Sequence, residues 1–174
     1  MKYLVKFFVI TFFVLTYTHV SAEQSIVYLD MKYILNNSKP GKEAQDFLKN
    51  TFEKNQEKFT DEEKKLKKAE LDLIEKKNIL SQDEYKKKAD ELRKNVASYQ
   101  SQRRKSLEEI AKKRAKARQD LIKAVNPIIM KYIDDNNISL VIDKKNVVGG
   151  NKSFDITEII IEKLNKELPS LNLK

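Results

Sequence analysis

The sequence contains no cysteine and no tryptophan, and its 174 residues include only three glycines, three prolines and one histidine. Without cysteine there is no disulfide scaffold, no thiol nucleophile and no cysteine zinc site. The shortage of glycine and proline argues against a turn-rich β-sandwich and a collagen-like repeat. Charge is abundant, because Asp, Glu, Lys and Arg make up 35% of the chain. This composition favours long charged helices.

Residues 1–22 resemble a secretory signal peptide. Two lysines precede an apolar run from Phe7 to Leu15, and small residues up to Ala22 provide a cleavage site. The apolar run has about half of the roughly 20 residues that span a bilayer, so a cleaved signal is favoured over a membrane anchor. Cleavage after Ala22 predicts a mature chain of residues 23–174, which lacks histidine because the single histidine is His19.

The mature chain has few means of catalysis. It contains no histidine base, no catalytic triad and no Cys/His metal site. Its carboxylates lie mostly among lysines on predicted helices, a pattern typical of solvent-exposed faces with pairs four residues apart. We therefore expect that the protein is not an enzyme and that it uses no cofactor and no metal.

Residues 42–79 contain neither proline nor glycine and predict a first long helix. Apolar side chains recur along it at intervals of seven, which is a heptad pattern. These positions are Phe52, Phe59, Leu66, Leu73 and Leu80. The positions four residues earlier are only half apolar, namely Leu48, Asn55, Glu62 and Ala69. Such a thin seam needs a partner helix that accepts its polar groups.

A second long helix is predicted to begin at Ser81, where Ser81 and Glu84 have the spacing of a capping box. With a tight turn before it, this helix would pack against the first as an antiparallel hairpin. The apolar positions expected to face the first helix are Tyr85, Ala89, Leu92, Val96, Tyr99, Leu107 and Ile110. The helix is expected to kink at Pro127 and to end at Asp134–Asn137.

The two ends of the chain predict a small body of strands and helix. Strands are expected at Ser25–Met31, Ile138–Asp143 and, after a turn, Val147–Val148, and a capping box at Asp155–Glu158 opens a final helix. The fold class is α+β, with residues 23–40 and 119–174 forming a β-containing body and residues 41–118 forming a coiled-coil hairpin arm.

A body this small, with open strand edges, would be stabilised by association with copies of itself. We therefore expect oligomerisation through the β-body rather than through the arm. The residues predicted to supply buried or strand-pairing positions in the oligomer are Ile26, Tyr28, Leu140, Ile142, Val147 and Val148.

The positive charge is concentrated on the second helix of the arm. Residues 84–118 contain 13 basic and five acidic residues, whereas residues 23–40, 41–80 and 119–174 are each balanced. A solubilising face is one interpretation, and steering of acidic partners is another. The candidate binding residues are Lys86, Lys87, Lys88, Arg93, Lys94, Arg103, Arg104 and Lys105.

Several of these segments together resemble the Skp/OmpH family of periplasmic chaperones. The resemblance covers the signal peptide and essentially the whole mature chain. Its most specific parts are Ile26–Met31, Ser38-x-x-Gly41-Lys42, Ile138–Asp143, Val147-Val148 and Asp155-Ile156-Thr157. It implies a periplasmic homotrimer whose three arms surround a cavity and hold unfolded outer-membrane β-barrel proteins without ATP, so that the basic arm residues would contact the client.

An anionic membrane lipid or lipopolysaccharide surface is a further partner that the resemblance suggests, although it assigns no residues to that contact. Two alternatives come from other classes of protein. A secreted trimeric coiled-coil structural or envelope protein would share the signal peptide and the helices, but a short arm with one turn differs from a long repeat array. A basic nucleic-acid-binding coiled coil is disfavoured because aromatic residues are sparse on the basic stripe and a signal peptide exports the chain.

Overall fold

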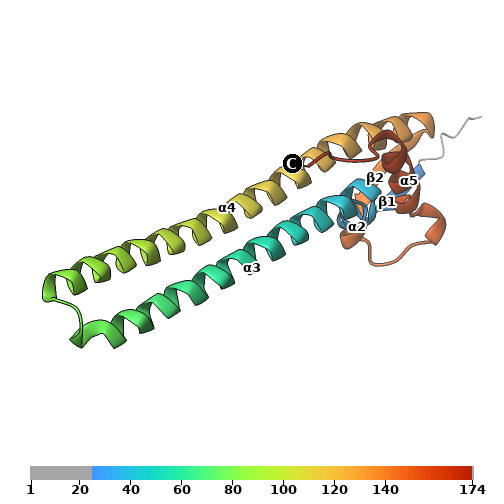
Figure 1. Cartoon of the computed structure of the whole chain (residues 1–174). Helices are drawn as coiled ribbons and strands as arrows, with labels where there is room; N and C mark the ends of the chain where they lie inside the picture. Colours follow the sequence, from blue (N-terminus) through green and yellow to red (C-terminus); the bar gives the residue numbers. More distant parts are fainter. Residues whose placement is uncertain (1–24, 174) are drawn as a thin grey trace, which may run out of the picture.

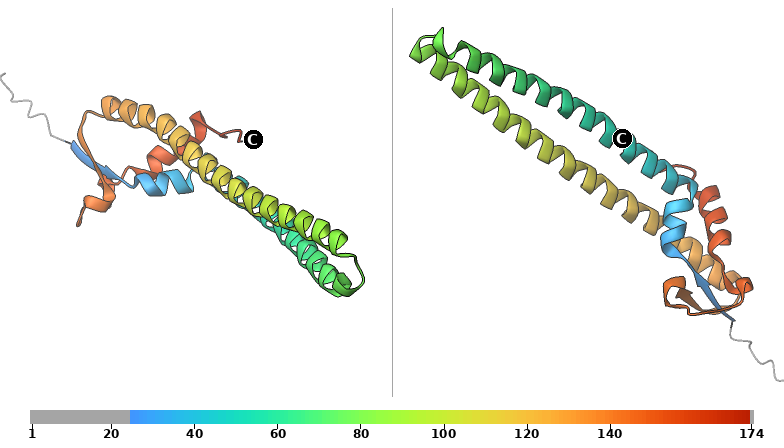
Figure 2. Two further views of the ribbon diagram at one scale, coloured as in Figure 1. Left: turned by 90° about the vertical axis from the view of Figure 1, so that its left-hand side faces the viewer. Right: turned by 90° about the horizontal axis from the view of Figure 1, so that it is seen from below.

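The computed structural model describes residues 25–173, so the predicted signal peptide lies outside the described residues. These residues are mostly helical and include one two-stranded sheet. Its main elements are β1 (Ser25–Leu29), α2 (Met31–Asn37), α3 (Lys39–Glu75), α4 (Gln82–Asp135), β2 (Ile138–Asp143) and α5 (Thr157–Glu167). Figure 1 shows α3 and α4 side by side, projecting from a compact end that holds the other elements, and the views in Figure 2 agree. We call the projecting helix pair the arm and the compact end the base.

The first long helix begins at Lys39, three residues earlier than expected, because Ser38 ends α2 and also caps α3. Ser38 is fully buried, and its amide donates to the carbonyl of Ile34 at the end of α2. Its hydroxyl accepts a hydrogen bond of 3.3 Å from the Gly41 amide and so caps α3. Pro40 is accommodated in the first turn of α3, where an amide would have no partner within the helix.

The far end of the arm is a short 3-10 turn, Lys76–Asn78, after which α4 begins. The predicted capping box is confirmed: the Ser81 hydroxyl accepts from the Glu84 amide, and the Glu84 carboxylate accepts from the Ser81 amide at 3.1 Å. These hydrogen bonds from Ser81 lower the pKa of Glu84 below its ordinary value. At 37 residues, α3 extends about 55 Å from the base at 1.5 Å per residue.

α4 continues through Pro127 as one helix of 54 residues and therefore belongs to both the arm and the base. It ends at Asp135, and the C-cap residue Asn136 donates from its side-chain amide to the carbonyl of Tyr132 at 2.8 Å. Asn137 follows with a φ of 51°, a left-handed conformation that asparagine adopts more readily than most residues. This turn directs the chain into β2.

β1 and β2 pair in parallel, with Ile26 beside Leu140 and Leu29 beside Asp143. The third strand predicted at Val147-Val148 is wrong. Asp143 accepts a hydrogen bond from the Lys145 amide and starts a 3-10 turn, Lys144–Asn146, which takes the chain out of the sheet. The other edge of β1 is instead met at one point, where Tyr28 forms a parallel bridge with Asp155.

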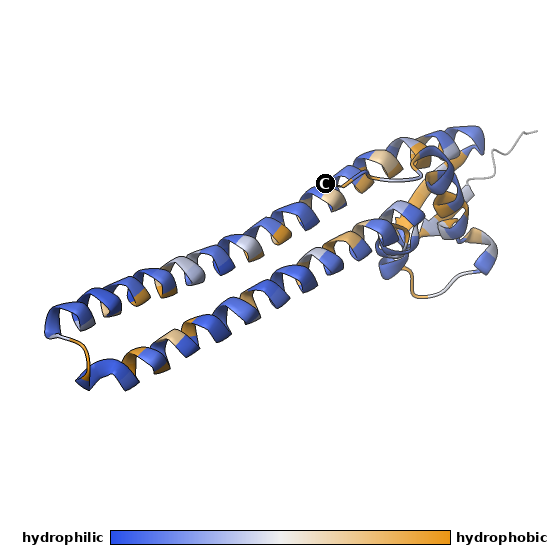
Figure 3. Cartoon of the chain, in the orientation of Figure 1, coloured by the Kyte–Doolittle hydropathy of each residue, from blue (hydrophilic) through white to orange (hydrophobic). Residues whose placement is uncertain are grey.

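The core of the base lies between the sheet, α2, α5 and the last turns of α4. Ile34, Val125, Ile160 and Leu164 are completely buried. Figure 3 shows apolar residues concentrated in the base and spaced more thinly along the arm. The base therefore carries most of the hydrophobic stabilisation, and the arm depends on a narrow contact between two helices.

The capping box predicted at Asp155–Glu158 is also wrong in its details. The N-cap residue of α5 is Ile156, immediately before Thr157, and it makes no side-chain cap hydrogen bond. Asp155 instead accepts from both the amide and the hydroxyl of Thr157, and the Thr157 hydroxyl accepts from the Asp30 amide at 2.9 Å. These hydrogen bonds attach the start of α5 to the end of β1.

Candidate functional site

The two helices of the arm meet through a seam that mixes apolar and polar contacts. The rings of Phe59 and Tyr99 pack edge to face, with their centroids 6.0 Å apart. The Tyr99 hydroxyl donates to Glu63 at 3.2 Å, and the Asn55 side-chain amide donates to the Ser106 hydroxyl at 2.8 Å. Desolvation, followed by the nearby Glu63 carboxylate, raises the pKa of Tyr99. The seam thus joins α3 to α4 at several separate points.

Three apolar residues expected in this seam are exposed instead. Phe52 is 43% exposed, Leu107 is 48% exposed and Val96 is 36% exposed. Phe59, Tyr99 and Ile110 are buried as expected. A straight helix drifts by about 20° per heptad relative to a strict seven-residue repeat, so a line of side chains cannot stay in the contact over the whole arm. The arm therefore presents apolar side chains on its surface.

The predicted basic residues all lie on α4, and all eight side chains are exposed. Arg93 is held by Asp90, with Nη1 and Oδ1 2.8 Å apart. The other seven make no ion pair with a residue that the structure describes. They are Lys86, Lys87, Lys88, Lys94, Arg103, Arg104 and Lys105. Because they are spread around the helix and along it, they form a positive field and not a single compact pocket.

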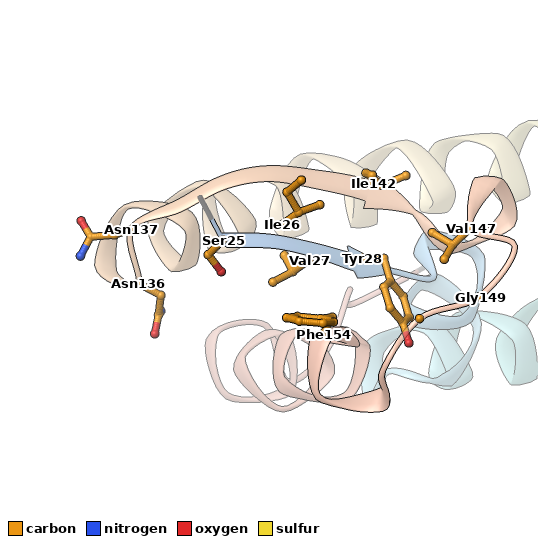
Figure 4. A pocket seen from close by; sticks show the side chains of 11 residues that line it. Ser25, Ile26, Val27, Tyr28, Asn136, Asn137, Ile142, Val147, Gly149 and Phe154 are labelled. Atoms are coloured by element: carbon orange, nitrogen blue, oxygen red, sulfur yellow. The ribbon is translucent and has the colours of Figure 1, made fainter. Parts of the chain in front are cut away.

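A second apolar surface lies on the base, around a cleft of about 770 Å³ beside the sheet. Four of the six predicted oligomerisation residues line it, namely Ile26, Tyr28, Ile142 and Val147. The other two, Leu140 and Val148, are exposed. Figure 4 shows the rings of Tyr28 and Phe154 bordering the cleft together with Ile26, Ile142 and Val147.

Phe154 is a cleft residue that the sequence reasoning missed, and it is 47% exposed. The available signal was a large aromatic residue in a loop of Gly, Asn, Lys and Ser. Exposed aromatic side chains of this kind are typical of interaction surfaces.

An ion pair holds the loops beside this cleft. Lys144 Nζ lies 2.7 Å from Asp155 Oδ2 and 5.9 Å from the centre of the Tyr28 ring. Burial tends to raise the pKa of Asp155, but the hydrogen bonds from Lys144 and Thr157 outweigh it, so this pKa lies below its ordinary value. The hydrogen bond with Asp155 raises the pKa of Lys144. The apolar cleft is therefore framed by a fixed polar network.

Comparison with known proteins gives the fold first and then the family. The fold is similar to the crystal structure of a candidate outer membrane chaperone (OmpH-like) from Caulobacter crescentus, with a TM-score of 0.82 and 21% sequence identity over 90% of this chain and 93% of that chain. A family model described as "Outer membrane protein (OmpH-like)" matches residues 25–164. The chain belongs to this family, as the resemblance predicted. A search of curated proteins finds no significant match.

Proposed function

We propose that the protein is an ATP-independent holdase that binds unfolded outer-membrane β-barrel proteins in the periplasm and prevents their aggregation. The observation that carries this proposal is the arm itself. It extends about 55 Å from the base, its α4 segment 84–118 has a large excess of basic residues, and apolar side chains such as Phe52 and Leu107 are exposed on it. Charge and apolar surface together suit an unfolded acidic chain with exposed hydrophobic residues.

The proposed active form is a homotrimer in which the three arms surround the client. The support for trimerisation is the exposed apolar surface around the sheet, which includes Ile26, Leu140, Val148 and Phe154. Large exposed apolar surfaces on soluble proteins commonly mark sites of interaction with other proteins. Several weak contacts from three arms would hold a client tightly, because each engaged arm raises the effective concentration of the next.

Residues 1–22 would direct export and be removed, which accounts for a periplasmic location. Within residues 25–173, no helix is long and apolar enough to cross a bilayer. The positive charge of α4 is also compatible with contact between the arm and an anionic lipid or lipopolysaccharide surface.

The test is aggregation of an acidic outer-membrane barrel diluted from urea, with and without the mature protein and with no nucleotide present. The expected result is suppression of light scattering at about one oligomer per client, together with capture of the client in a soluble complex. Unchanged aggregation would reject the proposal and favour a structural envelope role. Tight binding to duplex DNA without any effect on the client would favour the nucleic-acid alternative.

A further inference from the structure

A groove of about 600 Å³ lies where the arm joins the base. Its apolar lining comes from three helices, with Leu35 from α2, Leu48 from α3 and Leu121 from α4. Small residues at Ala44 and Ala117 leave room between the helices. The groove has space for one or two large side chains, but not for a folded domain.

The edge of this groove is positively charged. Arg114 and Arg118 lie one turn apart on α4, both are exposed, and neither makes an ion pair with a residue that the structure describes. Lys49 lies on the α3 side, and Asp46 is the single carboxylate among the lining residues. Two arginines four residues apart present planar groups that bind carboxylates through paired hydrogen bonds.

The apolar surface of the groove continues onto the arm. Phe52 is part of the lining, and it is 43% exposed. Leu107 lies seven residues before Arg114 and therefore on nearly the same side of α4. Both residues were expected in the seam between α3 and α4, and both are instead available to a bound molecule.

The C-terminal segment of the chain does not fill this groove. The Ser170 hydroxyl donates to Glu43 on α3 at 2.7 Å. Glu43 lies five residues before Leu48, which places it on roughly the opposite side of that helix. The end of the chain thus packs on one side of the arm, and the groove lies on the other.

From this geometry we infer that the groove binds an extended segment of an unfolded polypeptide in which an aromatic or large aliphatic side chain lies next to a carboxylate. The apolar side chain would lie against Leu48 and Phe52, and the carboxylate would accept hydrogen bonds from Arg114 and Arg118. The inference rests on the proposed function, because it assigns to one position on the arm part of the recognition of an unfolded client. It also predicts a preference that a diffuse positive field would not give.

The preference can be measured with the mature oligomeric protein and three fluorescent ten-residue peptides of Gly and Ser. The peptides differ only at their centre, which is Phe-Asp, Phe-Asn or Ala-Asp. Fluorescence anisotropy is expected to give about fivefold tighter binding of the Phe-Asp peptide than of either other peptide. Equal binding of the three peptides, or no binding of any of them, would overturn the inference.

The groove is tested by paired variants. The change Arg114→Gln with Arg118→Gln should remove the advantage of Phe-Asp over Phe-Asn, and Phe52→Ser should remove its advantage over Ala-Asp. The matched control, Lys112→Gln with Lys123→Gln, removes the same charge from the opposite side of α4 and should keep both preferences. Loss of the preference in the control as well would show that net charge, and not the groove, selects the peptide.

The same proteins are then used in the aggregation assay with the unfolded barrel. If the wild type and the groove variants suppress aggregation equally and no peptide is preferred, the groove is rejected as a binding site and the proposed function stands. A clear peptide preference in a protein that does not suppress aggregation would reject the proposed function and leave the groove as a peptide-binding site. Vesicles of anionic lipid added as competitor should not displace the Phe-Asp peptide, and displacement would favour a lipid as the natural occupant.

Discussion

Ile26 and Leu140 are paired in register across the two-stranded sheet, and their side chains are 46% and 52% exposed. Paired residues on neighbouring strands lie on the same face, so two large aliphatic side chains form a joint surface that the chain itself leaves uncovered. This is the most direct support in the base for association with other copies.

The first prediction concerns this pair. Leu140→Glu should convert the proposed oligomer to a monomer, because association would bury an unpaired carboxylate. Light scattering coupled to size-exclusion chromatography measures the mass at a fixed protein concentration. Ser139→Glu is the control, since the alternation of the strand places residue 139 on the other face, where it is exposed. An unchanged mass for Leu140→Glu would place the interface elsewhere, for example on the arm.

The second prediction concerns the junction of α2 and α3. A Cβ atom at Gly41 would lie 2.0 Å from the carbonyl oxygen of Leu35 and 2.9 Å from the Ser38 hydroxyl. Gly41→Ala should therefore lower the free energy of unfolding by about 1–3 kcal/mol or more, because backbone must move to admit the methyl group. Gly149→Ala is the control, since no atom lies within 4 Å of a Cβ there. Urea unfolding followed by circular dichroism compares the two, and equal stability would show that the junction adapts without strain.

The long helices could be predicted from the sequence because they depend on local signals. The capping box at Ser81 and Glu84 and the absence of proline and glycine between residues 42 and 79 define the arm without reference to any other part of the chain. The two strands were also predictable, because each is a short apolar run of β-prone residues.

The sequence-based predictions that the structure contradicts concern segments whose conformation depends on tertiary contacts. Val147 and Val148 have strand propensity, but the Asp143 cap turns the chain away before it can pair. Phe52 fits the heptad line, but helix geometry carries it out of the seam, where it lines the groove at the base of the arm. Neither the groove nor the cleft beside the sheet could be inferred from sequence, because each is lined by residues from segments far apart in the chain.

The third prediction concerns the polar contact within the arm. Asn55 and Ser106 are half-buried and hydrogen-bonded across the seam at 2.8 Å. Asn55→Ala should lower the free energy of opening of the arm by about 1 kcal/mol. A double-mutant cycle with Ser106→Ala should give a coupling free energy of about 0.5–1.5 kcal/mol. Hydrogen exchange of the arm amides measures these free energies in the intact protein. Additive effects of the two single changes would mean that the hydrogen bond does not stabilise the arm.

The fourth prediction concerns pH and the ion pair of Lys144 with Asp155. The pKa of Asp155 is lowered, so this carboxylate contributes stability that is complete above its ordinary value of 3.8 and is lost as the pH falls through its lower folded value. The pKa of Lys144 is raised, so its contribution is present below its ordinary value of 10.5 and is lost as the pH rises through its higher folded value.

Between these limits, Asp155→Asn should melt at a lower temperature than the wild type, and the difference should shrink at both acidic and alkaline extremes. Thermal melts at a fixed protein concentration, from pH 2 to pH 11, provide the measurement. A difference in melting temperature that stays constant across this range would mean that the lost hydrogen bonds, and not the charges, account for the effect.

The last prediction concerns capture of the client by charge. Residues 84–118 carry 13 basic and five acidic residues, so a trimer would place three such segments around one client. Attraction between this field and an acidic unfolded chain should speed the encounter and should weaken as salt shortens the range of the interaction. Reversing five of the basic residues should therefore slow capture while leaving the oligomer intact, because these charges lie on the arm and not in the base. The five substitutions are Lys86→Glu, Lys87→Glu, Lys88→Glu, Arg93→Glu and Lys94→Glu.

Salt is the internal control for this experiment. Stopped-flow measurement of client capture should show the wild type slowing toward the rate of the reversed variant as the ionic strength rises from about 0.01 M to about 1 M, where the Debye length falls from about 30 Å to about 3 Å. The variant itself should gain speed or stay constant over the same range, because salt screens its repulsion from the client. Replacing the same five residues with Gln should give an intermediate rate at low salt. Equal rates for all three proteins at low salt would reject electrostatic capture and leave the exposed apolar residues of the arm as the main contact with the client.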